Sequence, residues 1–416
     1  MVISKSQIIT VLSIIFLSWS CSGIKSDTSP RSSILLDEGW SFHLGDLEGG
    51  EAAELDHSSW RMLDLPHDWS IEDIPGTGSP LDSSAVGAID MGYFRNGTAW
   101  YRKLLDVPEE FGDKRLFLRF DGVYMNADIW INGEHLGNHP YGYTSFWYDV
   151  SDKLMAGADN VIAIRVANEG RNSRWYTGSG IYRHVWLTVT EPVHVSPWGT
   201  SVTTPEILKD RATVLVSNEI SNSSDRQEKL KVVTSILDEA GETVTQTESE
   251  IEISPGESSS LSQNLELSSP KLWSVDSPSL YRSVTEIQKG GAKVIDRVET
   301  TFGVRSIEFT QEGFFLNGEN VLLKGGCMHH DNGPLGSAAY DRAEERRVEL
   351  MKASGFNSIR CAHNPPSPAF LDACDRLGIL VIDESFDMWR KPKKPQDYSN
   401  YFDDWWKEDV KSMVLR

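Results

Sequence analysis

The chain has 416 residues, more than one hydrophobic core usually holds, so its length predicts two or three domains. It carries 40 Lys and Arg against 61 Asp and Glu, which gives a net charge of −21 at pH 7. A field of this sign repels nucleic acid and anionic membrane surfaces, so nucleic acid is excluded as a partner and a neutral partner is favoured. The 14 Trp and 12 Tyr can stack on sugars, although large aromatic side chains more often fill cores.

The amino terminus has the pattern of an export signal. A mostly apolar run from Ile8 to Trp19 is short for a bilayer span and suits the central part of a signal peptide. Cys21 follows it and resembles the processing site of a bacterial lipoprotein, although Trp19 is bulky where small residues are usual, so ordinary cleavage nearby is the alternative. We predict a signal peptide over 1–21, a polar linker over 22–33, and export to the periplasm, outer membrane or cell surface of a bacterium, with Cys21 as a lipid anchor.

The remaining cysteines do not indicate a disulfide framework. Cys327, Cys361 and Cys374 are odd in number and lie close together late in the chain. We expect all three to be buried thiols.

The next two regions have the pattern of β-sandwiches. Residues 34–190 contain short alternating runs broken by turn residues. The pair Asn132-Gly133 is the clearest hairpin signal, because both residues tolerate positive φ. Residues 191–303 continue with alternating segments, and about 110 residues of such short strands predict a second sandwich of immunoglobulin-like size.

After residue 303 the pattern changes to strands that alternate with helices. The expected strands are Val321–Gly325, Phe356–Ala362 and Ile379–Ile382. The expected helices begin at Asp341, at Ser367-Pro368 and at Asp403 or Asp404, and Glu344 has the spacing to complete a capping box with Asp341. Three strand–helix repeats over 304–416 predict the first three units of a parallel (β/α)8 barrel. The whole chain is therefore expected to be multidomain and mainly β.

Polar side chains follow each of the three strands, and the reactive groups of such barrels lie just past the carboxyl ends of strands. The residues at these ends are His329, His330 and Asp331, then Arg360, His363 and Asn364, then Asp383, Glu384 and Asp387. Polar caps and turns are common at strand ends, so one end alone indicates little. Three successive ends of this kind predict a site.

Strand geometry excludes two pairs of neighbours in this set from acting together, one as the two carboxylates of a glycosidase and the other as ligands of one metal ion. Asp383 and Glu384 are neighbours on a strand and point to opposite faces, whereas the two carboxylates of a retaining glycosidase lie about 5–5.5 Å apart. We expect Asp383 to fix Arg360 or a neighbouring loop. His329 and His330 likewise cannot both face one metal ion from an extended strand, so hydrogen bonding to a polar ligand is expected in place of zinc.

Several stretches resemble family 2 glycoside hydrolases, the group of β-galactosidases, β-glucuronidases and β-mannosidases. They include LPHDW at 65–69, WYRK at 100–103, WING at 130–133, NSRWYTGSGIYR at 172–183, KGGCMHHD at 324–331, RCAHNPP at 360–366 and DESFDMW at 383–389. The resemblance covers nearly everything from Ile34 onward. It implies the family's domain order, a jelly-roll sugar-binding domain over 34–190, an immunoglobulin-like sandwich over 191–303 and a barrel over 304–416.

The resemblance also implies a reaction and a set of site residues. The reaction is retaining removal of a terminal β-linked sugar by one Glu as acid/base and another as nucleophile. His329 and His363 match residues that reach sugar hydroxyls, and Arg360 matches one that supports the nucleophile's carboxylate and keeps it ionised. Site-supporting roles are expected for Asn364, Asp383 and Glu384. The loop that leans over the barrel mouth supplies Asn172, Ser173 and Trp175.

The resemblance places both catalytic glutamates after later barrel strands, so neither is expected within these 416 residues, and the chain by itself is expected to be inactive. Some family members hold Mg²⁺ with a Glu and a His, but the matching residues here are Asp387 and Trp389, so no metal and no other cofactor is expected. Nothing in the sequence indicates an oligomeric state.

The sequence thus predicts the N-terminal part of an exported, galactosidase-like exo-β-glycosidase of carbohydrate catabolism. Its partner is a carbohydrate substrate. The alternatives are β-glucuronidase or β-mannosidase specificity, or a carbohydrate-binding surface lipoprotein that does not hydrolyse.

Replacing the anchor cysteine should release the protein from membranes. Cys21→Ala is expected to move the protein to the soluble fraction, because a lipid chain on Cys21 beside a polar linker is the tether we predict. Fractionation of expressing bacteria followed by immunodetection measures this, with Cys327→Ala as the control that removes a different thiol. An unchanged membrane fraction in Cys21→Ala would count against lipidation.

Overall fold

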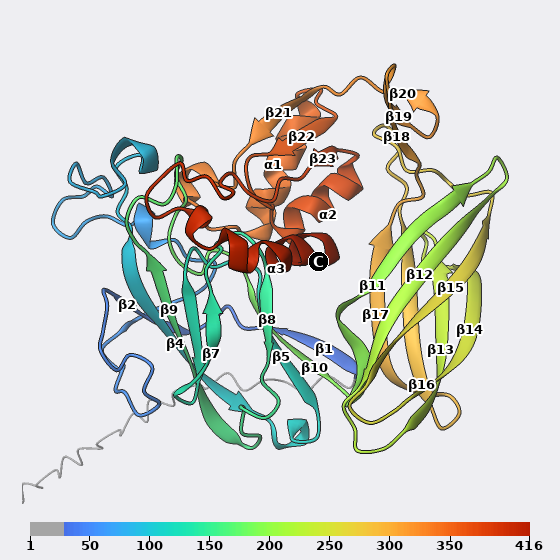
Figure 1. Cartoon of the computed structure of the whole chain (residues 1–416), viewed down its shortest axis with the longest axis horizontal. Helices are drawn as coiled ribbons and strands as arrows, with labels where there is room; N and C mark the ends of the chain where they lie inside the picture. The colour runs from blue at the N-terminus through green and yellow to red at the C-terminus, as the bar shows by residue number, and fades with distance from the viewer. Residues whose placement is uncertain (1–28) are drawn as a thin grey trace, which may run out of the picture.

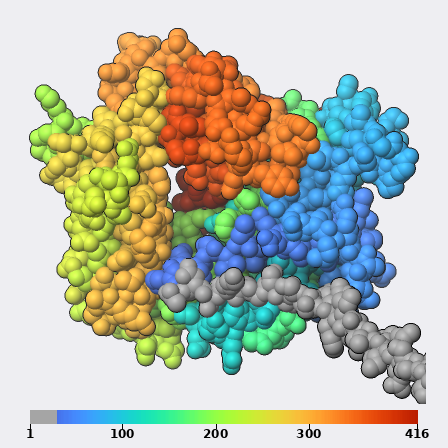
Figure 2. All heavy atoms as spheres, turned by 180° about the vertical axis from the view of Figure 1, so that it is seen from behind, coloured from blue at the N-terminus to red at the C-terminus, as the bar shows by residue number. Residues whose placement is uncertain are grey.

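The computed structural model describes residues 29–416, and the predicted signal peptide and Cys21 lie outside this range. Two β-sandwiches stand side by side, and a third region with parallel strands and helices contacts both of them (Figure 1). Seen from behind, the surface is hollowed between the two sandwiches, below the third region (Figure 2). The predicted mainly β, multidomain architecture is confirmed.

The first sandwich packs a four-stranded sheet, order β1-β10-β5-β8, against a six-stranded sheet, order β3-β2-β4-β9-β6-β7. All strand pairs in both sheets are antiparallel. The strands are β1 (Arg31–Leu35), β2 (Trp40–Leu44), β3 (Arg61–Leu63), β4 (Gly97–Val107), β5 (Arg115–Phe120), β6 (Ala127–Ile131), β7 (Glu134–His139), β8 (Phe146–Asp149), β9 (Ala158–Asn168) and β10 (Val185–Thr190). Alternate side chains such as Tyr101, Ile129 and Ile164 fill the core between the sheets. The predicted hairpin turn is confirmed, with φ of 51° at Asn132 and 82° at Gly133.

The second sandwich has a three-stranded sheet, β11-β12-β15, and a four-stranded sheet, β14-β13-β16-β17. Its strands are β11 (Val193–Ile207), β12 (Arg211–Asn222), β13 (Glu228–Leu237), β14 (Thr243–Ile253), β15 (Ser258–Ser268), β16 (Tyr281–Lys289) and β17 (Lys293–Phe302). A small sheet of β18 (Ile307–Thr310), β19 (Gly313–Leu316) and β20 (Glu319–Asn320) leads into the third region. Trp273 connects the second sandwich to the third region, because its Nε1 donates to the Asp375 carbonyl at 2.7 Å.

The third region contains a parallel sheet of β21 (Gly325–Met328), β22 (Ser358–Cys361) and β23 (Leu380–Ile382). The helices are α1 (Asp341–Ala353), α2 (Pro368–Leu377) and α3 (Phe402–Leu415). The strand predicted at Val321–Gly325 begins at Gly325 instead. The reason is that the backbone before it is engaged elsewhere: the Val321 amide donates to the Phe314 carbonyl, and the Lys324 amide donates to Asn357 Oδ1.

Two local predictions in this region need correction. The capping box is wrong, because the buried Glu344 accepts hydrogen bonds from Asn332 Nδ2 at 2.6 Å and from Ser367 Oγ at 3.0 Å instead of capping α1. Cys361 and Cys374 are buried as expected, but Cys327 is exposed. The Cys327 side chain lies with its Sγ 3.2 Å from Arg360 Nη1, outside the core that the other two thiols share.

The first sandwich and the third region share a large aromatic contact. The buried side chains at this contact are Tyr124, Met125, Tyr141, Tyr143, Tyr182, Phe386, Met388, Tyr398 and Phe402. Polar contacts add to it, for example the Arg183 Nη2 hydrogen bond to the Pro365 carbonyl at 2.9 Å. Among residues 29–416, no helix is both long enough and apolar enough to cross a membrane.

His184 joins the two regions through an ion pair on each side of its ring. Its Nδ1 lies 2.5 Å from Asp37 Oδ2 in the first sandwich, and its Nε2 lies 3.0 Å from Asp341 Oδ1 at the start of α1. Burial alone would lower its pKa, but the hydrogen bonds and charges of Asp37 and Asp341 outweigh burial and raise the pKa of His184 to about 9.

This histidine should make the stability of the protein depend on pH. A pKa raised from 6.5 means that the stabilisation is fully present below pH 6.5 and is lost as pH rises through about 9. His184→Gln should therefore lower the free energy of unfolding by about 1–3 kcal/mol at pH 6 and by much less at pH 9.5. Thermal unfolding at both values measures this, with His57→Gln as the control. A difference that stays constant between the two pH values would contradict the assignment.

Candidate active site

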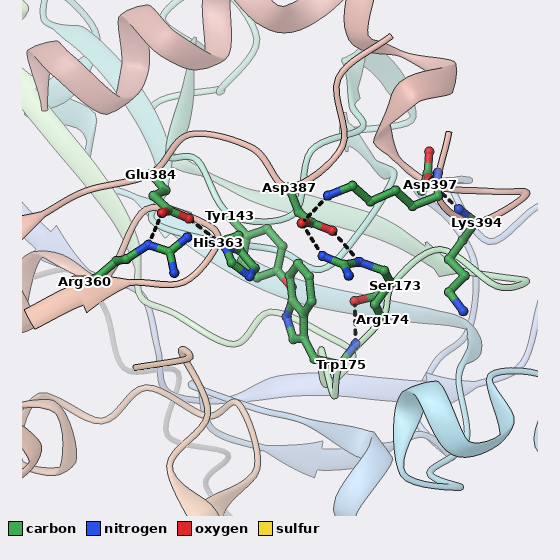
Figure 3. Close-up of polar contacts among 11 residues, drawn as sticks. Tyr143, Ser173, Arg174, Trp175, Arg360, His363, Glu384, Asp387, Lys394 and Asp397 are labelled. Carbon is green, nitrogen blue, oxygen red and sulfur yellow. Dashed lines mark hydrogen bonds and ion pairs between the residues drawn. The ribbon is translucent and has the colours of Figure 1, made fainter. Parts of the chain in front are cut away.

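The ends of the three parallel strands lie close together beside a loop of the first sandwich. Figure 3 shows His363 and Glu384 from two of these ends next to Trp175 of that loop. His329 follows β21, His363 follows β22 and Glu384 follows β23. The rings of His329 and His363 have centroids 5.9 Å apart, and His363 Nδ1 lies 2.7 Å from Glu384 Oε2. Side chains from the ends of all three strands therefore lie together, as the sequence pattern predicted.

Arg360 is held by Glu384 and not by Asp383. Its Nε donates to Glu384 Oε1, and its Nη2 lies 3.2 Å from His363 Nδ1 (Figure 3). The hydrogen bonds to Cys327 and Glu384 raise the pKa of Arg360 above its ordinary value, so the guanidinium stays charged. Asp383 was expected to fix either Arg360 or a neighbouring loop. It does not fix Arg360, because neighbouring residues at a strand end point in opposite directions and Glu384 takes that place.

Asp383 instead lies in a half-buried place where burial raises its pKa to about 6. Its Oδ1 has no hydrogen-bond partner within residues 29–416. Asn364 is also buried, and its Nδ2 is likewise unpaired within that range. Asn364 lines a small hollow together with His329, His330 and Arg347.

The two adjacent histidines face different surroundings, as the alternation of a strand requires. His330 is buried, with Nε2 2.9 Å from the Thr177 carbonyl of the first sandwich, and burial lowers its pKa to about 4. Burial also lowers the pKa of His329, so both rings are neutral at pH 7. A neutral imidazole offers one donor and one acceptor, which suits hydroxyl groups.

The covering loop, residues 169–175, presents Trp175 to the two histidines. The centroid of the Trp175 ring lies 5.2 Å from that of His329 and 5.5 Å from that of His363. Trp175 Nε1 donates to the hydroxyl of Tyr143 at 3.2 Å, which fixes the ring plane. The indole therefore forms one wall of the site, and the strand ends form another.

Asn172 and Ser173 hold this loop in shape. Asn172 is buried, with Nδ2 donating to Asn168 Oδ1 at 2.7 Å and Oδ1 accepting from the Tyr124 hydroxyl at 3.1 Å. Ser173 Oγ accepts from the Trp175 amide at 3.3 Å. Both residues also line the pocket beside Trp175. The lining residues are Tyr124, Met125, Tyr141, Gly142, Tyr143, Asn172, Ser173, Trp175, His363, Asp387, Met388 and Tyr398.

Arg174 ties the loop to the third region through Asp387, and Lys393 binds the same carboxylate. Arg174 donates to Asp387 through Nε at 2.9 Å and Nη2 at 2.5 Å, and Lys393 Nζ donates to the same carboxylate at 2.7 Å (Figure 3). Burial raises the pKa of Asp387, but these hydrogen bonds outweigh burial and leave its pKa below the ordinary value. Asp387 is therefore ionised and already neutralised by two cations.

The two residues that match the magnesium ligands of other family members do not fit a magnesium ion. Asp387 gives its oxygens to Arg174 and Lys393, and Trp389 is 60% exposed and stacks on Phe402. Nowhere in the described range do three or more His, Cys, Asp or Glu side chains cluster as metal ligands.

The sequence patterns did not identify Tyr143, Arg174 or Lys393 as part of the site. Arg174 lies between Ser173 and Trp175, which the family resemblance places in the site. That position in the sequence is the one sign that Arg174 also belongs to the site. Tyr143 belongs to the aromatic run Tyr141-Gly142-Tyr143, which the composition alone assigned to cores.

Comparisons with known proteins agree over most of the chain. Three family models match it: the sugar binding domain of glycosyl hydrolases family 2 over 53–192, the glycosyl hydrolases family 2 model over 193–305, and the family's TIM barrel domain over 307–405. A beta-galactosidase of Bacteroides ovatus is 43% identical over 95% of this chain, and a putative beta-glucuronidase of Formosa agariphila is 40% identical over 95%.

Solved structures give the same result. A glycosyl hydrolase family 2 member from Bacteroides cellulosilyticus is 50% identical with a TM-score of 0.90 over 92% of this chain and 50% of that one. The chain spans 46% of the Bacteroides ovatus protein and 37% of the Formosa agariphila protein, about half or less of these relatives' length. By its three matching domains, the chain belongs to family 2 of the glycoside hydrolases.

Proposed function

We propose that this chain forms the sugar-binding part of an exported, retaining β-glycosidase that removes a terminal β-linked galactose or a similar neutral sugar. The observation that carries the proposal is the position of Trp175. A residue of the first sandwich stands 5.2 and 5.5 Å from two histidine rings at the strand ends of the third region. Such an arrangement offers an indole face to the apolar side of a pyranose and imidazoles to its hydroxyls.

Arg360 supplies the group that a retaining reaction needs beside its nucleophile. Its planar guanidinium matches a carboxylate better than a point charge does. Glu384 binds Nε of Arg360. Among residues 29–416, Nη1 contacts only the sulfur of Cys327 at 3.2 Å, which is a weak acceptor. That edge of the guanidinium is suited to a further carboxylate, which it would keep ionised.

The charges of the pocket favour a neutral sugar over a uronic acid. Arg174 and Lys393 are both paired with Asp387, and Arg360 is paired with Glu384. A glucuronate would need a cation to replace the water around its carboxylate. In the described part of the chain, Asp387 already pairs with Arg174 and Lys393, and the open edge of Arg360 is the one assigned above to the nucleophile. No cation of that part is therefore left at this pocket for the carboxylate of a uronic acid, and the named beta-galactosidase relative is the better guide to the substrate than the beta-glucuronidase relative.

Calorimetric titration of the purified chain tests this proposal. The non-hydrolysable methyl β-D-thiogalactoside should bind, and the corresponding glucuronide should bind at least about tenfold more weakly. Trp175→Ala should weaken galactoside binding by about tenfold or more, because the ring loses its contact with the sugar face. Trp389→Ala is the matched control, since it removes an exposed indole that does not line the pocket. Tighter binding of the glucuronide, or unchanged binding by Trp175→Ala, would overturn the proposal.

A further inference from the structure

A second hollow lies on the first sandwich, separate from the pocket beside Trp175. It is a groove of about 570 Å³ on the outer face of the six-stranded sheet, whose strands β2, β4, β9 and β7 are labelled in Figure 1. This volume is within the usual range of ligand sites. The lining residues are Asp46, Leu47, Glu48, Gly49, Glu51, Trp100, Asp128, Trp130, His135 and Arg165.

The floor of the groove follows from strand alternation. Tyr101, Ile129 and Ile164 point into the core, so the residues next to them on β4, β6 and β9 point outward. The register places Trp100, Arg165 and Asp128 in one row across these three strands, because Trp100 pairs with Arg165 and Arg165 pairs with Asp128.

Trp130 is the aromatic surface of this floor. It is only partly buried, and its ring centroid lies 5.3 Å from that of Trp100 and 4.9 Å from that of His135. Trp100 itself is 2% exposed, so its role is to support its neighbour. The ring of Trp130 is therefore held in place while part of it stays open to a ligand.

One wall of the groove is a loop, residues 46–53, that is fastened down at both ends. Arg102 donates through Nη1 to the Gly50 carbonyl at 2.7 Å and through Nη2 to the Ala52 carbonyl at 2.9 Å. A Cβ at Gly50 would lie 2.5 Å from the Trp100 ring, so only glycine fits there. Asp46 accepts from Trp100 Nε1 at 3.2 Å and from Arg165 at 2.9 and 2.8 Å.

Polar groups surround the aromatic ring in a pattern that suits hydroxyls. Asp46 is paired with Arg165, and Asp128 lies 3.0 Å from His135 Nε2, so both carboxylates are fixed in orientation but remain partly exposed. The acidic residues of the lining outnumber Arg165 and His135, which disfavours an anionic ligand. Metal binding is disfavoured as well, since no set of three or more potential metal ligands gathers anywhere in residues 29–416.

We propose that this groove is a second, non-catalytic carbohydrate site that takes a neutral glycan, with a sugar ring stacked on Trp130 and hydroxyls bound by Asp46, Asp128 and Arg165. Carboxylates and a guanidinium around one open indole are the groups that a pyranose, with its apolar face and ring of hydroxyls, requires. The proposal concerns binding only and does not depend on the activity proposed for the pocket.

Native gel electrophoresis in the presence of soluble polysaccharides tests the groove. The probes are a galactan and hydroxyethyl cellulose, which are neutral, and polygalacturonate, which is anionic. The 416-residue chain should be retarded by at least one neutral polymer and not by polygalacturonate. Trp130→Ala and, independently, Asp128→Ala should abolish the retardation, with circular dichroism spectra and melting temperatures showing that each variant is folded.

Two further variants test where on the molecule the polysaccharide binds. Trp175→Ala, in the pocket, and Phe309→Ala, which removes an exposed ring on β18, should both stay retarded. The proposal is overturned if no neutral polymer retards the wild type, if folded Trp130→Ala remains retarded, or if polygalacturonate retards the chain. Retardation lost in Trp175→Ala but kept in Trp130→Ala would assign the binding to the pocket and likewise overturn it.

Discussion

The buried carboxylate of Asp68 joins the two regions on which the site depends. Its Oδ1 accepts from the amides of Ser70 and Ser179 at 2.9 Å in the first sandwich. Its Oδ2 accepts from the amide and hydroxyl of Ser337 at 2.8 and 2.9 Å in the third region, and from the hydroxyl of Tyr176. A buried carboxylate that lacks donors costs several kcal/mol, so only the docked arrangement satisfies this one.

This constraint determines where the sugar-facing loop can be. Tyr176 follows Trp175 directly, so the anchor at Asp68 fixes the carboxyl end of the loop while Asn172 fixes its other end. Gly178 passes so close to Ser337 that a Cβ would lie 2.0 Å from its Oγ. The Arg174 ion pair with Asp387 then closes the contact on the pocket side. The pocket is thus a property of the interface and of neither region alone.

Much of this arrangement could be predicted from local sequence. The turn at Asn132-Gly133, the Ser367 cap of α2 and the Gly378 stop each depend on one or two residues with a strong backbone preference. The strand-end rule likewise brought His329, His363 and Glu384 to one place, because parallel strands end at the same edge of a sheet.

The sequence-based predictions that were wrong or missing concern contacts between residues that are far apart in the sequence. The pairing of Arg360 with Glu384 in place of Asp383 depends on which way each side chain leaves the strand end. The buried Glu344 gives up its expected capping role to bind Asn332 and Ser367. Arg174 and Asp387 are 213 residues apart in sequence, and no local pattern relates them.

A crystal structure of the chain soaked with methyl β-D-thiogalactoside tests the central claim, that the interface of the first sandwich and the third region forms the sugar pocket. The account predicts electron density for the sugar against the Trp175 ring, with its hydroxyls within hydrogen-bond distance of His329 and His363, and with the Arg174–Asp387 ion pair intact. Density for the sugar away from Trp175, or a loop 169–175 detached from the strand ends while the sugar is bound, would contradict it.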